Sequence, residues 1–142
     1  KKLNIFCVLI DVKKLKKIGF FDEDFFLYWE DILLIDKVNK SNYKMIVANN
    51  IKAIHDSGSS TSNNVSIKFI RDSNFKYGEL LYDYKLFKLR KLKIIRQLFQ
   101  NIFFFTFRLF LFRKKEYLHN LANIYGILKF LMFLFRKIFF FN

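Results

Sequence analysis

Residues 19–31 read GFFDEDFFLYWED, and this stretch decides the expected fold. Its carboxylates are interleaved with Phe, Tyr and Trp, without a helical or strand period. Aromatic rings can stack on the apolar faces of sugars, and carboxylates accept hydroxyl protons or hydrogen bonds. Burial beside Tyr28 and Trp29 would raise the basicity of a neighbouring carboxylate. The residues alone also allow a simpler interpretation, in which Glu30 and Asp31 occupy the first turn of a helix, where negative charge suits the helix dipole.

The segments that precede and follow this stretch predict helices and strands in alternation. The apolar run 3–10, LNIFCVLI, predicts a buried strand. Residues 12–18 predict a short helix, and Gly19 stands where a helix-terminating glycine is favoured. Residues 29–40 carry apolar side chains at helical spacing, and Asn42 is placed to end that helix.

Two further strands and a loop are predicted before residue 65. Residues 43–47 and 51–54 predict short strands that a turn at Asn49 and Asn50 separates. Residues 57–64, SGSSTSNN, are the most loop-like stretch of the chain. We place the domain boundary there, with residues 1–64 in one part and residues 65–142 in the other.

Charge and aromatic content separate these two parts. Residues 1–64 hold ten lysines and eight acids, a net charge of +2, whereas residues 65–142 hold sixteen Lys/Arg and four acids, a net charge of +12. The second part also holds 16 of the 21 phenylalanines. Its pattern is helical throughout and predicts three pieces, with breaks near Lys114 and Phe139. The single cysteine, Cys7, excludes an internal disulfide and fits a reducing compartment.

Three interpretations are compatible with the basic second part. Its apolar runs, 102–112 and 127–135, are interrupted by Arg108 and Lys129 and fall short of the roughly 20 apolar residues that span a bilayer. Helices that lie on a membrane surface fit best, with Phe and Leu in the acyl boundary and Lys and Arg at anionic headgroups. An ordinary helical extension with a solvated basic face follows closely. Nucleic acid is the least expected partner, because no nucleic-acid-binding motif occurs.

The order of features in the first part resembles the acceptor-side segment of family-2 glycosyltransferases, and most closely their rhamnosyltransferase-like members. The likeness begins with residues 19–31 and continues through the following helix, Asn42-Tyr43-Lys44, Ile54-His55 and the loop 57–60. It covers roughly residues 3–61, with a weaker match at residues 71–85. The resemblance implies an α/β fold: the C-terminal part of a GT-A fold with a mostly parallel sheet, followed by the helical, basic extension.

The resemblance also implies an activity and its residues. It implies an inverting enzyme that transfers a sugar from a nucleotide-sugar to a polysaccharide or lipid-linked acceptor of the cell envelope. Asp31 would be the general base that removes the acceptor proton. Glu30, Trp29 and Asp22 would contact the substrates. Arg71 would pair with donor phosphate, or would be a charge on the helix surface near Asp72.

A divalent metal, Mn²⁺ or Mg²⁺, is implied as well. His55 would help to hold it, or would be a structural histidine at a strand end. Leu33 and Lys37 stand where relatives usually carry an acid and an arginine, and Asn42 stands where a glycine is common. These differences affect acceptor binding more than they affect the base.

No Asp-x-Asp motif precedes Gly19, so the nucleotide-binding half is expected outside this chain, and the chain alone is expected to be inactive. We therefore expect the base-bearing part of a glycosyltransferase that is peripheral to the cytoplasmic face of the cell membrane. The alternative is a non-catalytic basic module that binds a membrane surface or nucleic acid.

Overall fold

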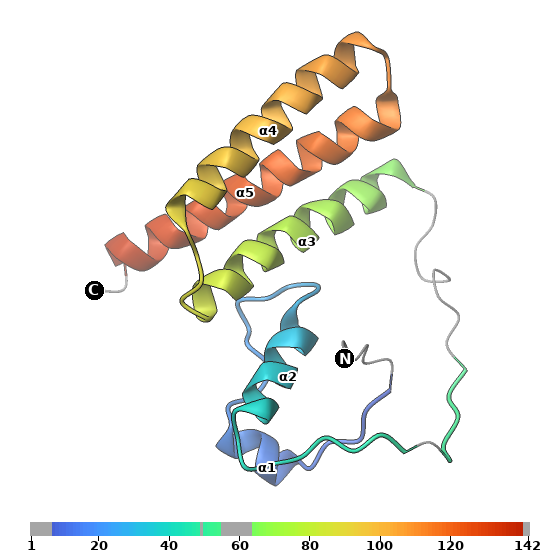
Figure 1. Ribbon diagram of the computed structural model, residues 1–142, viewed down its shortest axis with the longest axis vertical. Helices are drawn as coiled ribbons and strands as arrows, with labels where there is room; N and C mark the ends of the chain where they lie inside the picture. The colour runs from blue at the N-terminus through green and yellow to red at the C-terminus, as the bar shows by residue number, and fades with distance from the viewer. Residues whose placement is uncertain (1–6, 49, 55–63, 141–142) are drawn as a thin grey trace.

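Five α-helices form the regular structure of the chain (Figure 1). The computed structural model describes residues 7–48, 50–54 and 64–140. The helices, in chain order, are α1 (Val12–Lys17), α2 (Glu30–Asn39), α3 (Val65–Lys85), α4 (Lys91–Phe110) and α5 (Lys114–Phe140).

The three long helices form a layer with α5 in the middle (Figure 1). α5 packs along α3 on one side and along α4 on the other. Leu80 and Leu81 of α3 and Ile127 and Phe130 of α5 are fully buried in the core between them. Because burial of each such side chain contributes about 1.5–3 kcal/mol, this cluster is the main stabilising element of the layer.

The N-terminal segment docks on this layer through α3. The Asp11 carboxylate begins α1 by accepting hydrogen bonds from the backbone N–H groups of Lys13 and Lys14, at 3.0 and 3.2 Å. Gly19 follows the end of α1 with a φ of +77°, which glycine adopts without strain. Phe25 and Leu33 then join the same core cluster as Leu80 and Leu81.

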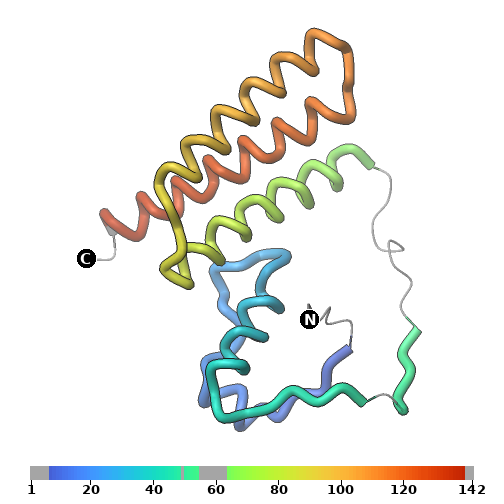
Figure 2. Tube along the Cα trace, in the orientation of Figure 1, coloured from blue at the N-terminus to red at the C-terminus, as the bar shows by residue number. Residues whose placement is uncertain are grey.

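The predicted α/β fold is wrong, because the described residues form helices and no strand. Residues 43–47 and 51–54 run out from α2 as an irregular segment (Figure 2), with Ile46, Val47, Ile51 and Ile54 exposed. Residues 7–10 are also irregular, and the rest of the first predicted strand lies outside the described residues. The alternating pattern favours extended backbone, but a strand also needs a partner for its N–H and C=O groups. The GT-A sheet that the resemblance implied is therefore absent from the described part of the chain.

Most of the helix predictions are confirmed. α1 and α2 match the helices predicted at 12–18 and 29–40, and residues 65–140 are helical in three pieces, with one break beside Lys114. The break predicted near Phe139 is wrong, because α5 continues to Phe140. The other break lies between α3 and α4, where Phe87 adopts a left-handed φ of 56° that ends α3. No glycine or proline marks this turn in the sequence, so the pattern did not reveal it.

Candidate functional site

Residues 19–29, which connect α1 to α2, end in a strained pair of residues. Tyr28 and Trp29 both have positive φ, 66° and 72°, although neither is glycine. Each such residue costs about 1–3 kcal/mol and persists only where the surrounding structure enforces it. The strained pair lies directly before Glu30, the first residue of α2. The backbone at this point is therefore held in one conformation by its tertiary contacts.

Packing of the Trp29 side chain against α3 supplies those contacts. The indole ring lies 5.4 Å from the ring centre of Phe75 and 5.2 Å from that of Tyr82, and its N–H donates to the Phe75 carbonyl at 3.1 Å. Gly78 makes room for it, because a Cβ there would lie 2.8 Å from Trp29 Cδ1. Trp29 was predicted to contact substrate, and the structure places its ring in contacts within the protein.

The acidic pair Glu30–Asp31 forms the first turn of α2, as the simpler interpretation of the sequence expected. Both residues are half-buried. One Asp31 carboxylate oxygen accepts the backbone N–H of Ile32 at 2.8 Å. Glu30 Oε2 is buried and has no hydrogen-bond partner among the described residues. Since a buried carboxylate oxygen without a donor is costly, the Glu30 side chain is a polar group that a ligand or a further segment would satisfy.

Asp22, the other predicted substrate contact, belongs to an ion-pair cluster with α3. Lys85 Nζ lies 2.9 Å from an Asp22 oxygen and 2.5 Å from an Asp24 oxygen. Burial alone would lower the pKa of Lys85, but its hydrogen bonds to Asp24 and Asp22 outweigh burial and raise that pKa. Tyr77 Oη donates to the Asp24 carbonyl at 3.2 Å. The Asp22–Asp24 turn is therefore fixed on α3 next to the Trp29 contact.

Arg71 lies on α3, one helical turn before Phe75 and on the same side of the helix. Its Nε atom is 3.4 Å from Asp72 Oδ1, a contact between neighbouring residues. Thus the structure shows the surface pairing with Asp72 that was the second interpretation of Arg71. Phe75 contacts Trp29, so Arg71 lies one helical turn along α3 from the Trp29 contact.

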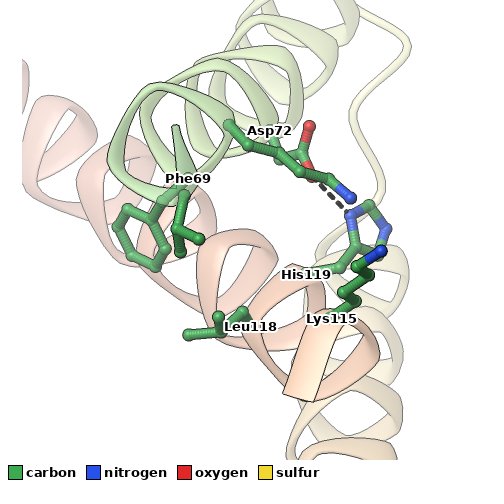
Figure 3. A pocket seen from close by; sticks show the side chains of 7 residues that line it. Phe69, Asp72, Lys115, Leu118 and His119 are labelled. Atoms are coloured by element: carbon green, nitrogen blue, oxygen red, sulfur yellow. Dashed lines mark hydrogen bonds and ion pairs between the residues drawn. The ribbon is translucent and has the colours of Figure 1, made fainter. Parts of the chain in front are cut away.

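A second polar cluster joins α3 and α5 (Figure 3). His119 Nδ1 lies 2.8 Å from Asp72 Oδ2, and His119 Nε2 lies 3.3 Å from Asn123 Nδ2. The pair borders a cavity of about 340 Å³ whose other lining residues are Val65, Lys68, Phe69, Lys115 and Leu118. No local sequence pattern marks His119 as a functional residue, because 47 residues separate it from Asp72. Only the crossing of α3 and α5 brings the two together.

The described residues do not form a metal site. They contain no group of three or more His, Cys, Asp or Glu side chains that could hold an ion. His55, the predicted metal ligand, lies outside the described residues.

The structure thus brings Asp22, Trp29, Glu30 and Asp31 together on the α2–α3 side of the molecule. An ion pair with Lys85 joins Asp22 to α3, and ring packing joins Trp29 to α3; Glu30 and Asp31 follow Trp29 directly in the chain. No family model matches this chain, and no curated protein or solved structure shows a significant match to it.

Proposed function

We propose that this chain carries the acceptor-activating part of an inverting glycosyltransferase, with Asp31 as the general base. The observation that supports this most is the strained Tyr28–Trp29 backbone, which fixes the following acidic pair at the start of α2. Backbone strain of this kind clusters at functional sites, where it holds groups in the geometry that the chemistry needs. A base on a rigid helix end has the positional precision that proton abstraction requires.

The proposed reaction is a single displacement at the anomeric carbon of a nucleotide-sugar. The Asp31 carboxylate takes the proton of the acceptor hydroxyl while the hydroxyl oxygen attacks that carbon. The bond from the carbon to the diphosphate oxygen breaks, and the nucleoside diphosphate leaves with the bonding electrons. Attack opposite to the leaving group inverts the configuration. The acceptor would be a glycan or a lipid-linked saccharide.

Glu30 has a supporting role in this proposal. Its buried, unpartnered Oε2 is suited to accept a hydrogen bond from a sugar hydroxyl. Trp29 positions the acidic pair through its packing on α3 and does not itself stack on sugar. Arg71, one helical turn before Phe75 on α3, would pair with donor phosphate, and Asp22 orders the turn that precedes Trp29 through its ion pair with Lys85.

The test is the Asp31→Asn variant, expressed from its complete open reading frame alongside the unaltered protein. Transfer of radiolabelled sugar from a panel of nucleotide-sugars to the membrane fraction is measured. Asn keeps the size of the side chain but cannot accept the proton, so transfer should fall roughly 10²–10⁴-fold. Glu23→Gln is the matched control, because Glu23 is an exposed acid of the same segment, and it should leave transfer unchanged.

Two results would refute the proposal. One is transfer by Asp31→Asn at the unaltered rate. The other is no transfer by the unaltered protein from any donor of the panel. Circular dichroism of each variant checks that the helices are retained.

A further inference from the structure

α4 has an apolar outer face. The exposed apolar residues of α4 include Leu92, Phe99, Phe103 and Phe110, which share one side of the helix with the exposed Arg96 and Thr106. Leu92, Phe99, Phe103 and Phe110 follow one another at intervals of seven, four and seven residues, which places them in one stripe. Ile94 is the only residue of α4 that is buried. α4 lies at the edge of the helical layer (Figure 1), so the described part of the chain does not cover this stripe.

The inner side of α4 carries polar contacts beside its core residues Ile94 and Leu98. Gln97 donates to Glu79 of α3 at 3.3 Å. Asn101 accepts hydrogen bonds from Asn120 and Asn123 of α5, each at 3.1 Å. Arg108 reaches the Asn120 side chain at 2.7 Å and Glu116 at 3.1 Å. α4 thus combines these polar contacts with the core residues Ile94 and Leu98 on its inner side, whereas several of its phenylalanines are exposed. A contiguous row of exposed phenylalanines is unusual on a helix side that faces water.

Both turns that flank α4 expose a strained phenylalanine. Phe87 and Phe112 end α3 and α4 with φ of 56° and 53°, at positions where glycine is usual. Their side chains are 98% and 92% exposed. In water, each combines backbone strain with a solvated ring, so both features are unfavourable. An apolar environment around the two rings would offset the free-energy cost of their exposure at both ends of α4.

The charge around this face has one sign. Residues 86–142 contain twelve Lys/Arg and a single acid, Glu116. Lys88, Arg90 and Lys91 lie beside Phe87, and Arg113 and Lys114 lie beside Phe112. Basic residues thus bracket the apolar stripe at both ends, which complements an anionic surface.

We propose that α4 lies flat on an anionic lipid bilayer, with its outer stripe and the two terminal phenylalanines in the acyl boundary. The twenty residues of α4 give a helix about 30 Å long, so the bracketing lysines and arginines reach the headgroups at both ends. The proposal is independent of the proposed sugar transfer. A second copy of the chain is a poorer occupant, because two faces of the same positive charge would repel.

The same contacts favour lying on the membrane over crossing it. α5 is long and apolar enough to span a bilayer by length and composition. However, α5 is packed between α3 and α4, and Lys129 in its second half is directed toward α3 by a 2.7 Å hydrogen bond to Asn74. α3 carries the Lys76–Glu79 ion pair, and Asp83 of α3 pairs with Lys93 of α4; hydrocarbon disfavours such charges. Crossing would require these contacts to break.

The experiment is flotation of the full chain with vesicles of phosphatidylglycerol and phosphatidylcholine, and with vesicles of phosphatidylcholine alone. We expect binding to the anionic vesicles, and weaker binding at high salt. The double variant Phe99→Asp/Phe103→Asp should bind roughly tenfold more weakly or worse, because it removes apolar contact and adds negative charge. Ile46→Asp is the matched control on a residue that is 89% exposed outside the layer, and it should bind normally.

A second measurement does not depend on how the double variant folds. Trp29 is the only tryptophan and packs on α3. In Phe99→Trp, the added indole should be quenched by brominated lipid, whereas the Trp29 signal of the unaltered chain should not be. Absence of quenching at residue 99 would overturn the proposal. So would resistance of the bound chain to alkaline carbonate extraction, which indicates spanning, or a lipid-free dimer that the double variant converts to a monomer.

Discussion

Gly78 is the residue on which docking of the candidate site on α3 depends most directly. A Cβ at this position would lie 2.8 Å from Trp29 Cδ1 and 3.2 Å from the Tyr28 carbonyl oxygen. Overpacking of this kind costs about 1–3 kcal/mol. The higher helix propensity of alanine would return at most about 1 kcal/mol. Because the Tyr28 backbone is already strained, it has little freedom to move away.

Gly78→Ala should therefore lower the free energy of unfolding and shift the Trp29 emission to longer wavelength, as the indole leaves α3 for water. Urea unfolding and fluorescence measure the two effects, and Trp29, the only tryptophan, reports without interference. Gln100→Ala, at an exposed position of α4, is the control and should change neither. A Gly78→Ala protein that gained stability with unchanged emission would show that Trp29 does not pack there.

At the scale of a single helix, the start of α3 depends on one side chain. The Asn64 side chain accepts the backbone N–H of Ser66 at 2.8 Å, which satisfies one of the free donors at the helix start. Asn64→Ala should lower the free energy of unfolding by about 1 kcal/mol, measured by urea unfolding. Ser66→Ala keeps the backbone N–H that Asn64 uses and should have a smaller effect. Equal losses in the two variants would contradict the cap.

The sequence could predict those parts of the fold that depend on neighbouring residues, such as the starts and ends of helices. Gly19 and the apolar spacing of residues 29–40 act within a few positions of themselves, so α1 and α2 were predicted close to their bounds. Ile46 and Ile54 lie in apolar stretches that favour extended backbone, but strand pairing depends on distant residues, which local pattern does not contain. Phe87 ends α3 at a position where glycine is the usual signal, so the α3–α4 turn had no local mark.

The candidate site also has a part that local sequence predicts and a part that depends on distant residues. The acidic pair Glu30–Asp31 and its place in the first turn of a helix could be predicted, because both depend on neighbouring residues. The packing of Trp29 on Gly78 and the pairing of His119 with Asp72 could not, because each joins residues more than 40 positions apart. The hydrogen bond from Asn120 to Asn101 could not be predicted either, because it joins residues of two different helices.

For the whole molecule, the balance between a net charge of +14 and a few carboxylates determines stability in acid. Glu79 lies between Lys76 at 2.6 Å and Lys93 at 3.0 Å, and it accepts a hydrogen bond from Gln97. Burial alone would raise the pKa of Glu79, but its hydrogen bonds and charge interactions with the two lysines outweigh burial and lower that pKa below 4.5. The unfolded chain therefore binds this proton more readily than the folded chain does.

The contribution of Glu79 to the free energy of unfolding should be fully present above pH 4.5, the pKa of the unfolded chain. It should be lost as the pH falls through the lower pKa that Glu79 has in the folded chain. Once Glu79 is protonated, Lys76 and Lys93 also repel each other and the remaining positive charge, so α3 and α4 separate. Urea unfolding at a series of pH values should show this loss, and Glu79→Gln should be less stable at neutral pH with a shallower dependence on acid. If Glu79→Gln kept the full acid dependence, the loss of stability would have to arise at other carboxylates, such as Asp83, which also pairs with Lys93.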